Sequence, residues 1–393
     1  MTAFISGAII EINQRLRFFK SKKTTERNKL QILGGVQLKA VRMYKPGDLR
    51  VESVSKPEMK SDEAMIKVRA VGVCGSDIPR ALTYGAHVSP ITLGHEFSGE
   101  IEAVGSDVTK FKVGDHVVVP PLIPCYECEW CKKGIYSLCE DYDYYGSRRD
   151  GAFAEYVSVK EGNLIKVPDG IPFEDSATLD PCANGYHSLA QANFKEGDSV
   201  CVVGAGPIGL FAAQYAKLYG ASKVIAVDVW DEKLDVAKKV GVDVVINSKN
   251  EDAIEAVRAA TDGKGANIVI DFSGSPIAQK QTFLMASKMG RIVFLGISHE
   301  GLNLEEKDVD TLMRSQLSLI GSWNSFTAPY PGVDWTESLK AFNEMGMTAK
   351  DIISHRLPLD EVPHIFEEIS KGGYFFNKIM FYPNGYDGEF DTV

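Results

Sequence analysis

The feature that most constrains the fold is a repeated alternation of strand and helix in the second half of the sequence. From residue 197 onward, apolar runs without polar alternation are separated by stretches with helical spacing of apolar residues. Such runs are typical of strands buried on both faces of a parallel sheet. The runs are Val200–Val203, Val224–Asp228, Val244–Asn247, Ile268–Asp271, Ile292–Leu295 and Leu317–Ile320. This repetition predicts a doubly wound α/β domain.

A glycine-rich turn follows the first of these strands. The segment GAGPIG at 204–209 lies between a buried strand and an apolar-periodic helix, which is the context that a dinucleotide-binding turn requires. Gly204 would allow the tight turn, Gly206 would let the backbone approach the pyrophosphate, and Gly209 would permit close helix packing. The amino terminus of the helix would then face the phosphates. We therefore predict a dinucleotide site that includes Gly204, Gly206, Pro207, Ile208 and Gly209.

A carboxylate ends the second predicted strand. Asp228 lies 24 residues after Gly204, where it could accept hydrogen bonds from the adenosine ribose. The same carboxylate would repel a 2′-phosphate, which favours NAD over NADP. Lys233, in the following helix, is predicted to belong to the same site. The alternative interpretation of Asp228 is a helix-capping residue without a ligand.

The first half of the chain has a different pattern. Between residues 37 and 181, short alternating segments are separated by Gly and Pro, which predicts a compact, mostly β domain. Residues from about 326 onward leave the strand and helix repetition and could return to this first domain. We predict a first domain at 38–185, a nucleotide-binding domain at 186–325, a returning segment at 326–383 and a flexible tail at 384–393.

Four cysteines lie close together within the predicted β domain. Cys125, Cys128, Cys131 and Cys139 have a spacing that lets four thiolates bind one tetrahedral zinc ion and leaves no open coordination position. This pattern predicts a structural zinc site in a lobe at 120–142, which contains several prolines and little core of its own. The total of seven cysteines is odd, which argues against a disulfide framework.

A second, more dispersed group also contains metal-binding residue types. Cys74 lies in the segment VCGSD, and His95 and Glu96 lie in the segment LGHEF. Taken alone, each has an ordinary structural interpretation, because Cys is commonly buried and a single His is usually a satisfied polar group. Beside a dinucleotide turn and a four-cysteine lobe, they point to a catalytic metal site.

Together these motifs resemble those of the zinc-containing medium-chain alcohol and polyol dehydrogenases. The resemblance covers residues 38 to about 383. It implies that the first domain is GroES-like, that the last segment returns to it, and that the active site lies between the domains. It also implies that Cys74 and His95 hold a catalytic zinc ion, with Glu96 or Asp180 as the third ligand. Many polyol dehydrogenases have Glu-Pro where this chain has Asp180-Pro181.

The resemblance implies an enzyme that oxidises an alcohol with two zinc ions and NAD. A zinc ion with an open coordination position acts as a Lewis acid on the alcohol oxygen, and nicotinamide accepts the hydride. In many relatives, a hydroxyl beside the zinc-binding Cys and a His five positions after that Cys relay the proton. Ser76 fits the first role, whereas Pro79 occupies the second position. The proton would then leave through the ribose, water or another side chain.

Several segments resemble the branch of this family that oxidises galactitol 1-phosphate, among them Cys74–Arg80 and Tyr145–Gly151. This likeness implies a polyol phosphate as substrate and a keto-sugar phosphate as product. A phosphate needs positive donors, and His87, Arg148 and Arg149 are the candidates, although they could equally be ordinary surface residues. An unphosphorylated polyol such as sorbitol or iditol is the next candidate substrate. Threonine follows, because the segment DPCANGYH at 180–187 is similar to threonine dehydrogenases.

Composition limits the partners and the location. The net charge of −10 disfavours a nucleic-acid groove, which would need clustered Lys and Arg. No apolar run approaches the roughly 20 residues of a membrane helix, so we expect a cytoplasmic enzyme that acts on a small molecule, without a membrane partner. The family resemblance implies a homodimer or a homotetramer. A non-catalytic nucleotide-binding protein with the same fold is the remote alternative.

Residues 1–37 differ in charge from the rest of the chain. They contain seven Lys or Arg and two Glu, whereas residues 38–393 contain 36 basic and 51 acidic residues. An amphipathic membrane-surface arm or a basic transit peptide would fit this composition. We favour a simpler interpretation, in which these residues are an untranslated leader or a disordered extension.

Overall fold

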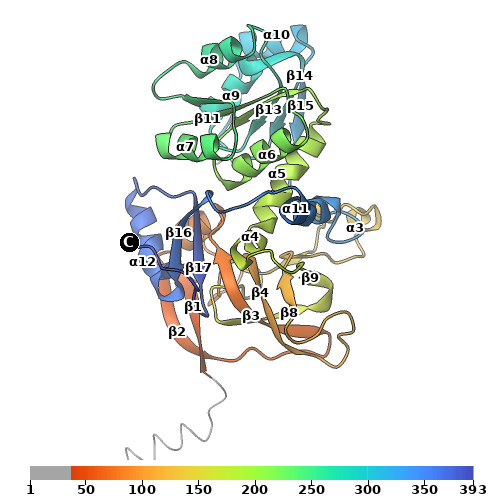
Figure 1. The fold of residues 1–393 in the computed structure, drawn as a ribbon, viewed down its shortest axis with the longest axis vertical. Helices are drawn as coiled ribbons and strands as arrows, with labels where there is room; N and C mark the ends of the chain where they lie inside the picture. The colour runs from red at the N-terminus through yellow and green to blue at the C-terminus, as the bar shows by residue number, and fades with distance from the viewer. Residues whose placement is uncertain (1–36, 299, 393) are drawn as a thin grey trace, which may run out of the picture.

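The computed structural model describes residues 37–298 and 300–392, which form two domains that meet at helix α5 (Leu179–Gln191) (Figure 1). The upper domain, drawn mainly in green and cyan, is a parallel sheet with helices on its faces. The lower domain combines antiparallel strands drawn in orange with the last strands of the chain, drawn in blue. The fold class predicted from the sequence is confirmed, while the interpretation of residues 1–36 concerns a segment outside the described residues.

The nucleotide-binding domain contains a six-stranded sheet in the order β12-β11-β10-β13-β14-β15, with every neighbouring pair parallel. The central strands are apolar because helices cover both faces of the sheet. The strands are β10 Ser199–Val203, β11 Lys223–Asp228, β12 Val244–Asn247, β13 Ala266–Asp271, β14 Ala286–Phe294 and β15 Ser318–Gly321. The helices are α6 Pro207–Leu218, α7 Asp231–Lys239, α8 Ala253–Ala260, α9 Pro276–Met285 and α10 Glu306–Arg314. The strand order reverses between β10 and β13, which is where such sheets bind ligands.

The first domain is built on a seven-stranded sheet. Its strands follow the order β16-β17-β3-β4-β5-β9, with β8 pairing β3, and β1 and β2 form a separate hairpin. The strands are β1 Gln37–Lys45, β2 Asp48–Ser55, β3 Glu63–Gly72, β4 Glu96–Val104, β5 His116–Val118, β8 Tyr156–Lys160, β9 Ile165–Lys166, β16 Ile353–Pro358 and β17 Lys378–Tyr382. Strand β17 pairs antiparallel with β3, through Met380 with Gly72 and Phe381 with Val71. The last strand of the chain therefore completes a sheet that begins near its start.

Short elements connect these strands. They are α2 Asp77–Pro79, η1 Arg80–Tyr84, β6 Leu122–Ile123, α3 Glu129–Lys132, η2 Tyr136–Leu138, β7 Asp143–Tyr144, η3 Glu161–Asn163, α4 Phe173–Ala177, η4 Leu359–Glu361 and α12 Val362–Lys371. Among the residues that the structure describes, no helix combines the length and apolar character of a membrane span.

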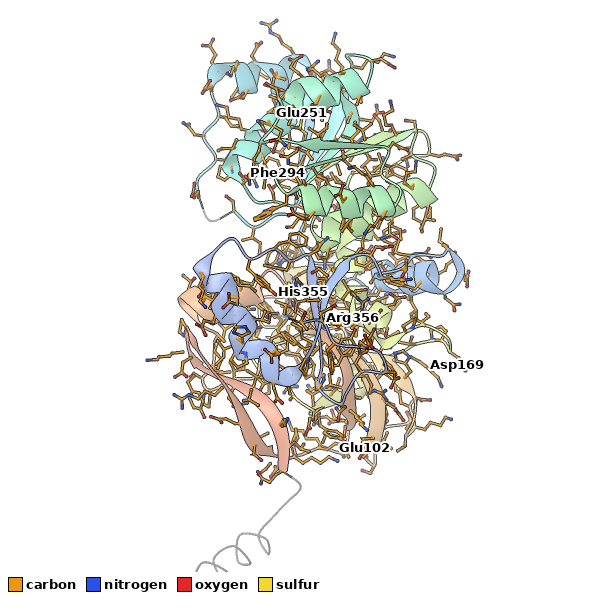
Figure 2. All side chains as sticks on the ribbon, turned by 60° about the vertical axis from the view of Figure 1, so that its left-hand side comes forward. Glu102, Asp169, Glu251, Phe294, His355 and Arg356 are labelled. Atoms are coloured by element: carbon orange, nitrogen blue, oxygen red, sulfur yellow. The ribbon has the colours of Figure 1, made fainter. Side chains whose placement is uncertain are left out.

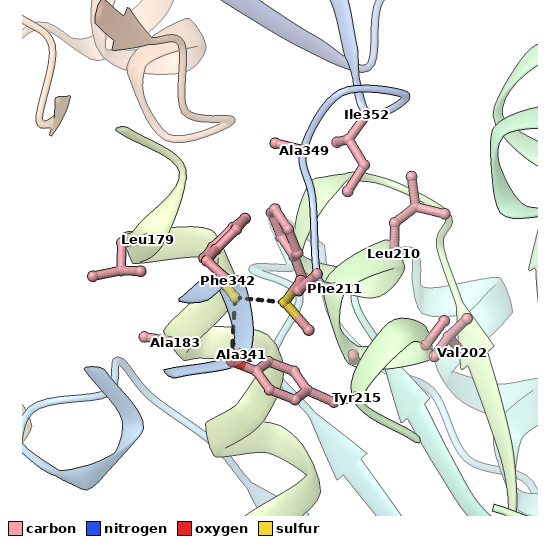
Figure 3. Close-up of a cluster of buried hydrophobic side chains, with 14 of the residues drawn as sticks. Leu179, Ala183, Val202, Leu210, Phe211, Tyr215, Ala341, Phe342, Ala349 and Ile352 are labelled. Carbon is pink, nitrogen blue, oxygen red and sulfur yellow. Dashed lines mark hydrogen bonds between the residues drawn. The ribbon is translucent and has the colours of Figure 1, made fainter. Parts of the chain in front are cut away.

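Helix α5 packs into a core that both domains share. Its buried side chains contact α6 and α11 (Val333–Glu344), as the close-up in Figure 3 shows. Cys182 Sγ on α5 lies 3.3 Å from the hydroxyl of Tyr215 and 3.2 Å from Met347 Sδ. The rings of Phe211 and Phe342 meet edge to face, with centroids 5.9 Å apart. Because α11 follows the nucleotide-binding domain in the sequence, this core connects three separate segments of the chain.

The residues after β17 lie against the first domain. Asn384 Nδ2 donates to the carbonyl oxygens of Val68 and Glu155, at 2.9 and 2.8 Å. The Asp391 carboxylate accepts the backbone N–H of Arg356 at 2.6 Å. Arg356, labelled in Figure 2, pairs with both carboxylate oxygens of Glu174 at 3.0 Å. Asn384 and Asp391 thus connect the tail, for which we predicted flexibility, to β3 and β16.

The His116 side chain generates a prediction about the pH dependence of stability. Burial, together with the charge of Arg69, lowers the pKa of this imidazole from 6.5 to about 4, while its Nε2 lies 2.9 Å from Ser176 Oγ. Protonation therefore favours the unfolded chain, whose His pKa is about 6.5. This contribution to stability is complete above about pH 6.5 and is lost as the pH falls toward about 4.

Replacing His116 removes this titration. In His116→Gln, the thermal midpoint should fall less steeply with decreasing pH than in the unmodified chain, so the difference between the two profiles changes below about pH 6.5. Parallel profiles from differential scanning fluorimetry would contradict the assignment.

Candidate functional site

The four clustered cysteines come together in the lobe between β6 and β7. Their sulfur atoms all lie within 4.8 Å of one another. Backbone N–H groups point at these sulfurs: those of Glu127 and Cys128 donate to Cys125 Sγ at 3.4 and 3.3 Å. N–H donors, first among them that of Glu140, lower the pKa of the Cys128 thiol to about 6. Burial raises the pKa of the Cys131 and Cys139 thiols, so the backbone donors favour the thiolate form at Cys125 and Cys128. Four sulfur atoms gathered in this way are the donor set that structural zinc takes, so the residues present fit the ion.

A loop from the far end of the chain holds this lobe in place. Ser137 and Phe326 form three hydrogen bonds. The backbone N–H and the hydroxyl of Ser137 both donate to the Phe326 carbonyl, and the Phe326 N–H donates to the Ser137 hydroxyl in return. The Ala328 N–H donates to the Gly134 carbonyl at 2.8 Å. The Tyr330 hydroxyl donates to the Leu122 carbonyl. The lobe is therefore anchored to the segment that follows β15.

A second metal-binding group lies at the end of β3 and the start of β4. One ligand atom from each of Cys74, His95 and Glu96 lies within 4.8 Å of the other two. The pairing of β3 with β4 produces this arrangement, since Gly72 is opposite Glu96 in the register. A Cβ atom at Gly72 would lie 2.9 Å from Glu96 Oε2, so only glycine leaves room for that carboxylate. A thiolate, an imidazole and a carboxylate with an open side are the donor chemistry of a catalytic zinc site.

Asp77, which was not among the residues predicted for the site, contacts two of these candidate ligands. Its side chain is fully buried. Oδ2 accepts the Cys74 N–H at 3.1 Å, and Oδ1 lies 3.4 Å from His95 Nδ1. A carboxylate behind a metal-binding imidazole fixes the ring and leaves its other nitrogen for the metal. Ser76, the predicted proton carrier, donates from Oγ to Cys74 Sγ at 3.3 Å. The sequence signal that could have identified Asp77 is its position as an acidic residue three places after Cys74.

The two candidate third ligands have different surroundings. Glu96 belongs to the 4.8 Å group, but its Oε2 also pairs with Lys378 Nζ, and both side chains are almost fully buried. Lys378 also donates to the Val73 carbonyl at 2.8 Å. Asp180 is buried nearby without being a member of the group. Burial raises the pKa of the Asp180 carboxyl to about 7, with opposing effects of His95 and Glu96.

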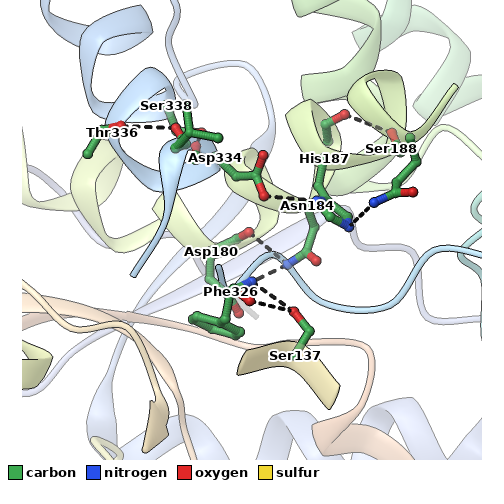
Figure 4. A network of polar contacts seen from close by, with 12 residues as sticks. Ser137, Asp180, Asn184, His187, Ser188, Phe326, Asp334, Thr336 and Ser338 are labelled. Carbon is green, nitrogen blue, oxygen red and sulfur yellow. Dashed lines mark hydrogen bonds and ion pairs between the residues drawn. The ribbon is translucent and has the colours of Figure 1, made fainter. Parts of the chain in front are cut away.

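Asp180 begins a polar face of helix α5, drawn in Figure 4. Asn184 Nδ2 donates to the carbonyl oxygen of Asp180 at 2.9 Å and to its carboxylate at 3.3 Å. One turn later, His187 Nδ1 lies 2.8 Å from the Asp334 carboxylate on α11. All four side chains are largely buried. This face joins α5 to α11 through His187 and Asp334.

Aromatic rings extend from the metal-binding group toward Arg148. The Tyr144 ring packs edge-on against His95, with centroids 5.6 Å apart. Tyr142 meets Tyr144 at 6.2 Å, and the Arg148 guanidinium lies 4.4 Å from the Tyr142 ring centroid. The Arg148 N–H donates to the Tyr144 carbonyl at 3.0 Å, so one tight turn presents both side chains. Arg148 is thereby connected to His95 through two aromatic rings.

Two further basic side chains accompany Arg148. Burial and the charges of Arg148 and Arg80 all lower the pKa of His87, whose backbone N–H donates to the carbonyl of Ser147, next to Arg148, at 3.2 Å. Arg80 lies on the catalytic side as well, with Nη1 3.6 Å from Asp77 Oδ1. Arg148 Nε is buried and has no hydrogen-bond partner among the described residues. An unsatisfied buried donor of this kind fits an anionic group of a ligand.

The structure separates Arg149 from this basic group. Arg149 Nε pairs with Asp143 at 2.9 Å, and its guanidinium lies 5.2 Å from the Tyr145 ring centroid. It lines a different cavity of about 500 Å³, between the β1-β2 hairpin and β8. Gly146, two residues before Arg148, has a φ of 75°, and a Cβ atom there would lie 3.0 Å from the carbonyl carbon of Gly94. No local sequence pattern distinguishes Arg148 from its neighbour Arg149.

The glycine-rich turn connects β10 to α6. Gly204 has a φ of 101°, and a Cβ atom at Gly209 would lie 2.2 Å from the Gly204 carbonyl oxygen. No atom lies within 4 Å of the position that a Cβ atom at Gly206 would occupy, so the turn is open on that side. Pro207 and Ile208 are the first residues of α6. An open concavity at a helix amino terminus fits a pyrophosphate.

Asp228 lies at the end of β11, next to this turn. Its Oδ2 accepts the Ala205 N–H at 2.7 Å, and its Oδ1 accepts the N–H groups of Val229 and Trp230 at 2.7 and 3.0 Å. Three backbone donors therefore fix the carboxylate beside the open turn. Lys233 is partly exposed in the first turn of α7, within the same part of the domain.

Comparisons with known proteins agree with this geometry. Residues 60–169 match the alcohol dehydrogenase GroES-like domain, and residues 207–342 match the zinc-binding dehydrogenase family. Galactitol 1-phosphate 5-dehydrogenase of Escherichia coli K12 is 37% identical over 326 residues, which cover 83% of this chain and 94% of that protein. Sorbitol dehydrogenase of Bacillus subtilis 168 is 31% identical, covering 88% of this chain and 98% of that protein.

Solved structures give the same result. The crystal structure of galactitol-1-phosphate dehydrogenase from Escherichia coli matches with a TM-score of 0.83 and 36% identity, over 88% of this chain and 100% of that chain. Two similar dehydrogenases, 29% and 27% identical, were solved with NADP and with NADH respectively. The chain is thus an oxidoreductase that uses zinc and a nicotinamide cofactor on a small molecule. It belongs to the zinc-type medium-chain alcohol and polyol dehydrogenase family.

Proposed function

We propose that this enzyme oxidises a secondary hydroxyl of a polyol phosphate, with galactitol 1-phosphate as the first candidate, and produces a keto-sugar phosphate. The observation that carries this proposal is the basic group formed by Arg80, His87 and Arg148 beside the metal-binding residues. The orphaned Arg148 Nε would gain a phosphate oxygen as its partner. The similarity to galactitol 1-phosphate 5-dehydrogenase supports the same substrate. Arg149 has a structural role in this proposal, because Asp143 already neutralises it.

Cys74, His95 and Glu96 would hold the catalytic zinc ion, and Cys125, Cys128, Cys131 and Cys139 would hold a structural one. When bound, the catalytic zinc polarises the alcohol oxygen and nicotinamide takes up the hydride.

The chain's own residues prepare this site. Asp77 orients Cys74 and His95 through its two carboxylate oxygens. Tyr144 covers one side of His95 and excludes water there. We assign the first proton transfer to Ser76 Oγ, which lies 3.3 Å from Cys74 Sγ. Pro79 offers no side-chain acceptor for a second transfer.

NAD is the proposed cofactor. The Asp228 carboxylate is fixed beside the glycine-rich turn by three backbone N–H groups. A 2′-phosphate placed near this carboxylate would meet a like charge, whereas ribose hydroxyls could donate to it. Lys233 belongs to the proposed site as a neighbouring side chain on α7.

The proposed assembly is a homodimer or homotetramer. Strand β15 is at the edge of the six-stranded sheet, and Leu319 on it is 45% exposed. Trp323 and Met313, close to β15 in the sequence, are also exposed. Proteins usually cover an open apolar edge, and a second copy would do so here. Light scattering during size-exclusion chromatography measures the mass directly.

A parallel assay tests the substrate. Purified enzyme should reduce NAD with galactitol 1-phosphate at a higher kcat/KM than with galactitol, sorbitol or threonine, and should use NADP poorly. Chelation of zinc should abolish the activity, and added zinc should restore it. A higher kcat/KM with threonine than with galactitol 1-phosphate would favour a threonine dehydrogenase, the alternative that the polar face of α5 supports. A higher kcat/KM with sorbitol than with galactitol 1-phosphate would favour an unphosphorylated polyol as substrate.

The two neighbouring arginines provide a matched pair of variants. Arg148→Ala should raise KM for galactitol 1-phosphate by about 10- to 100-fold, because a charged hydrogen bond of about 1.5–3 kcal/mol is lost. KM for free galactitol should change little. Arg149→Ala removes the same charge one residue away and should leave the ratio of the two KM values unchanged. Equal effects of the two variants on that ratio would contradict the assignment of the phosphate to Arg148.

Metal analysis tests the two zinc sites. Cys128→Ser and Cys74→Ser should each lose one zinc ion per chain by mass spectrometry, from different sites, while Cys201→Ala in β10 should keep both. Glu96→Gln should weaken zinc binding at Cys74 more than Asp180→Asn does, because only Glu96 belongs to the 4.8 Å group. The reverse order would identify Asp180 as the third ligand.

A further inference from the structure

A cavity of about 810 Å³ lies at the amino-terminal ends of β10 and β11, whereas the glycine-rich turn follows the carboxyl end of β10. Ser199 and Lys223, the first residues of β10 and β11, line it, whereas Gly204 follows the other end of β10. The loop from the end of α8 to β13 and the first part of β14 complete the wall. No residue of the dinucleotide turn or of either cysteine group lines this cavity. It is therefore distinct from the catalytic site.

The lining is strongly basic in a chain of net charge −10. It contains the four cationic side chains Lys223, Arg258, Lys264 and Lys288, with Asp262 as its one carboxylate. Within residues 37–298 and 300–392, none of the four cations forms an ion pair with a carboxylate. Like charges that share a cavity repel one another, so an anion bound among them would be stabilised.

Two of the cations are held in fixed positions. Lys223 Nζ donates to the Ala260 carbonyl at 2.7 Å. Arg258 Nε donates to the Leu284 carbonyl at 3.0 Å, and its Nη1 donates to the Gly263 carbonyl at 3.2 Å. Positive charges interact favourably with the carboxyl end of a helix, which explains why Lys223 and Arg258 lie at the end of α8. They are partly buried and keep part of their donor capacity.

The other two cations have no such structural role. Lys264 and Lys288 are exposed at the rim of the cavity, and no hydrogen bond or ion pair of their ammonium groups occurs in the described part of the chain. Helix capping does not explain why two more positive charges are placed beside Lys223 and Arg258. The hydroxyl groups of Ser222, Ser287 and Ser315 line the same cavity and add neutral donors. Cations and hydroxyls together are the chemistry that binds a phosphate.

We propose that this cavity binds the phosphate group of a phosphorylated small molecule, as a second anion site separate from the substrate and the cofactor. Its volume is within the range of small-molecule pockets, roughly 300–1,000 Å³. Lys223 and Arg258 provide the fixed inner charges, and Lys264 and Lys288 close over the anion from the rim. Because the site is at the other end of β10 from the dinucleotide turn, occupancy does not compete with NADH.

Calorimetric titration of the zinc-loaded enzyme with inorganic phosphate tests this proposal. NADH is kept saturating so that the pyrophosphate cradle is filled, and chloride keeps the ionic strength constant. Arg148→Ala, which lacks the proposed substrate phosphate site, should still bind one phosphate per chain. Adding Lys264→Gln and Lys288→Gln to this variant should weaken that binding at least fivefold. Adding Lys239→Gln and Lys350→Gln, which remove two exposed charges elsewhere, should leave it unchanged.

Three results would overturn the proposal. They are no phosphate binding by Arg148→Ala, equal affinity after the Lys264→Gln and Lys288→Gln exchange, and an equal loss in the control pair. Circular dichroism and NADH affinity establish that each variant is folded. Failure of the polyol phosphate assay would leave this titration unaffected, because it contains no substrate.

Discussion

The buried ion pair between Glu96 and Lys378 is the contact on which the catalytic site depends. Two charges removed from water are costly unless they meet each other and further donors or acceptors. Here the Val73 carbonyl accepts a second Lys378 hydrogen, and the absence of a side chain at Gly72 leaves the space for the carboxylate. The pair also joins the first residue of β4 to the first residue of β17. The arrangement of the candidate metal ligands and the closure of the sheet therefore depend on the same ion pair.

The junction between the two domains also combines contacts of the candidate site with contacts of the core. Helix α5 carries Asp180 at its start and buries Cys182 against Tyr215 and Met347, so one helix contributes to the metal surroundings and to the shared core. The His187 and Asp334 pair ties its polar face to α11. The cofactor turn and the candidate metal-binding residues belong to different domains, and α5 joins the two. Precise positioning of two reactants is a major source of catalytic rate.

Local patterns were sufficient to predict most of the fold and the central site residues. The buried strands around 200–203 and 224–228, the glycine-rich turn and the four-cysteine spacing each have a short-range physical cause. Contacts across long sequence separations were not predictable in this way. Nothing local indicates that Lys378 meets Glu96, and Asp77 and Arg80 became visible only when the short helix after Cys74 was placed. The different contacts of Arg148, with the Tyr142 ring, and of Arg149, with Asp143, are visible only in the folded turn.

The position of β17 in the sheet also determines when the enzyme can mature. During synthesis, the ribosome has already released Cys74, His95 and Glu96 long before Lys378 emerges, so Glu96 must wait for its counter-charge. The cysteine lobe also lacks a contact at this stage, because Phe326, which anchors it, is synthesised after the whole nucleotide-binding domain. That domain is continuous in the sequence and can fold first. Until Lys378 has emerged, the nascent chain therefore carries a Glu96 carboxylate without its counter-charge and a sheet that lacks β17.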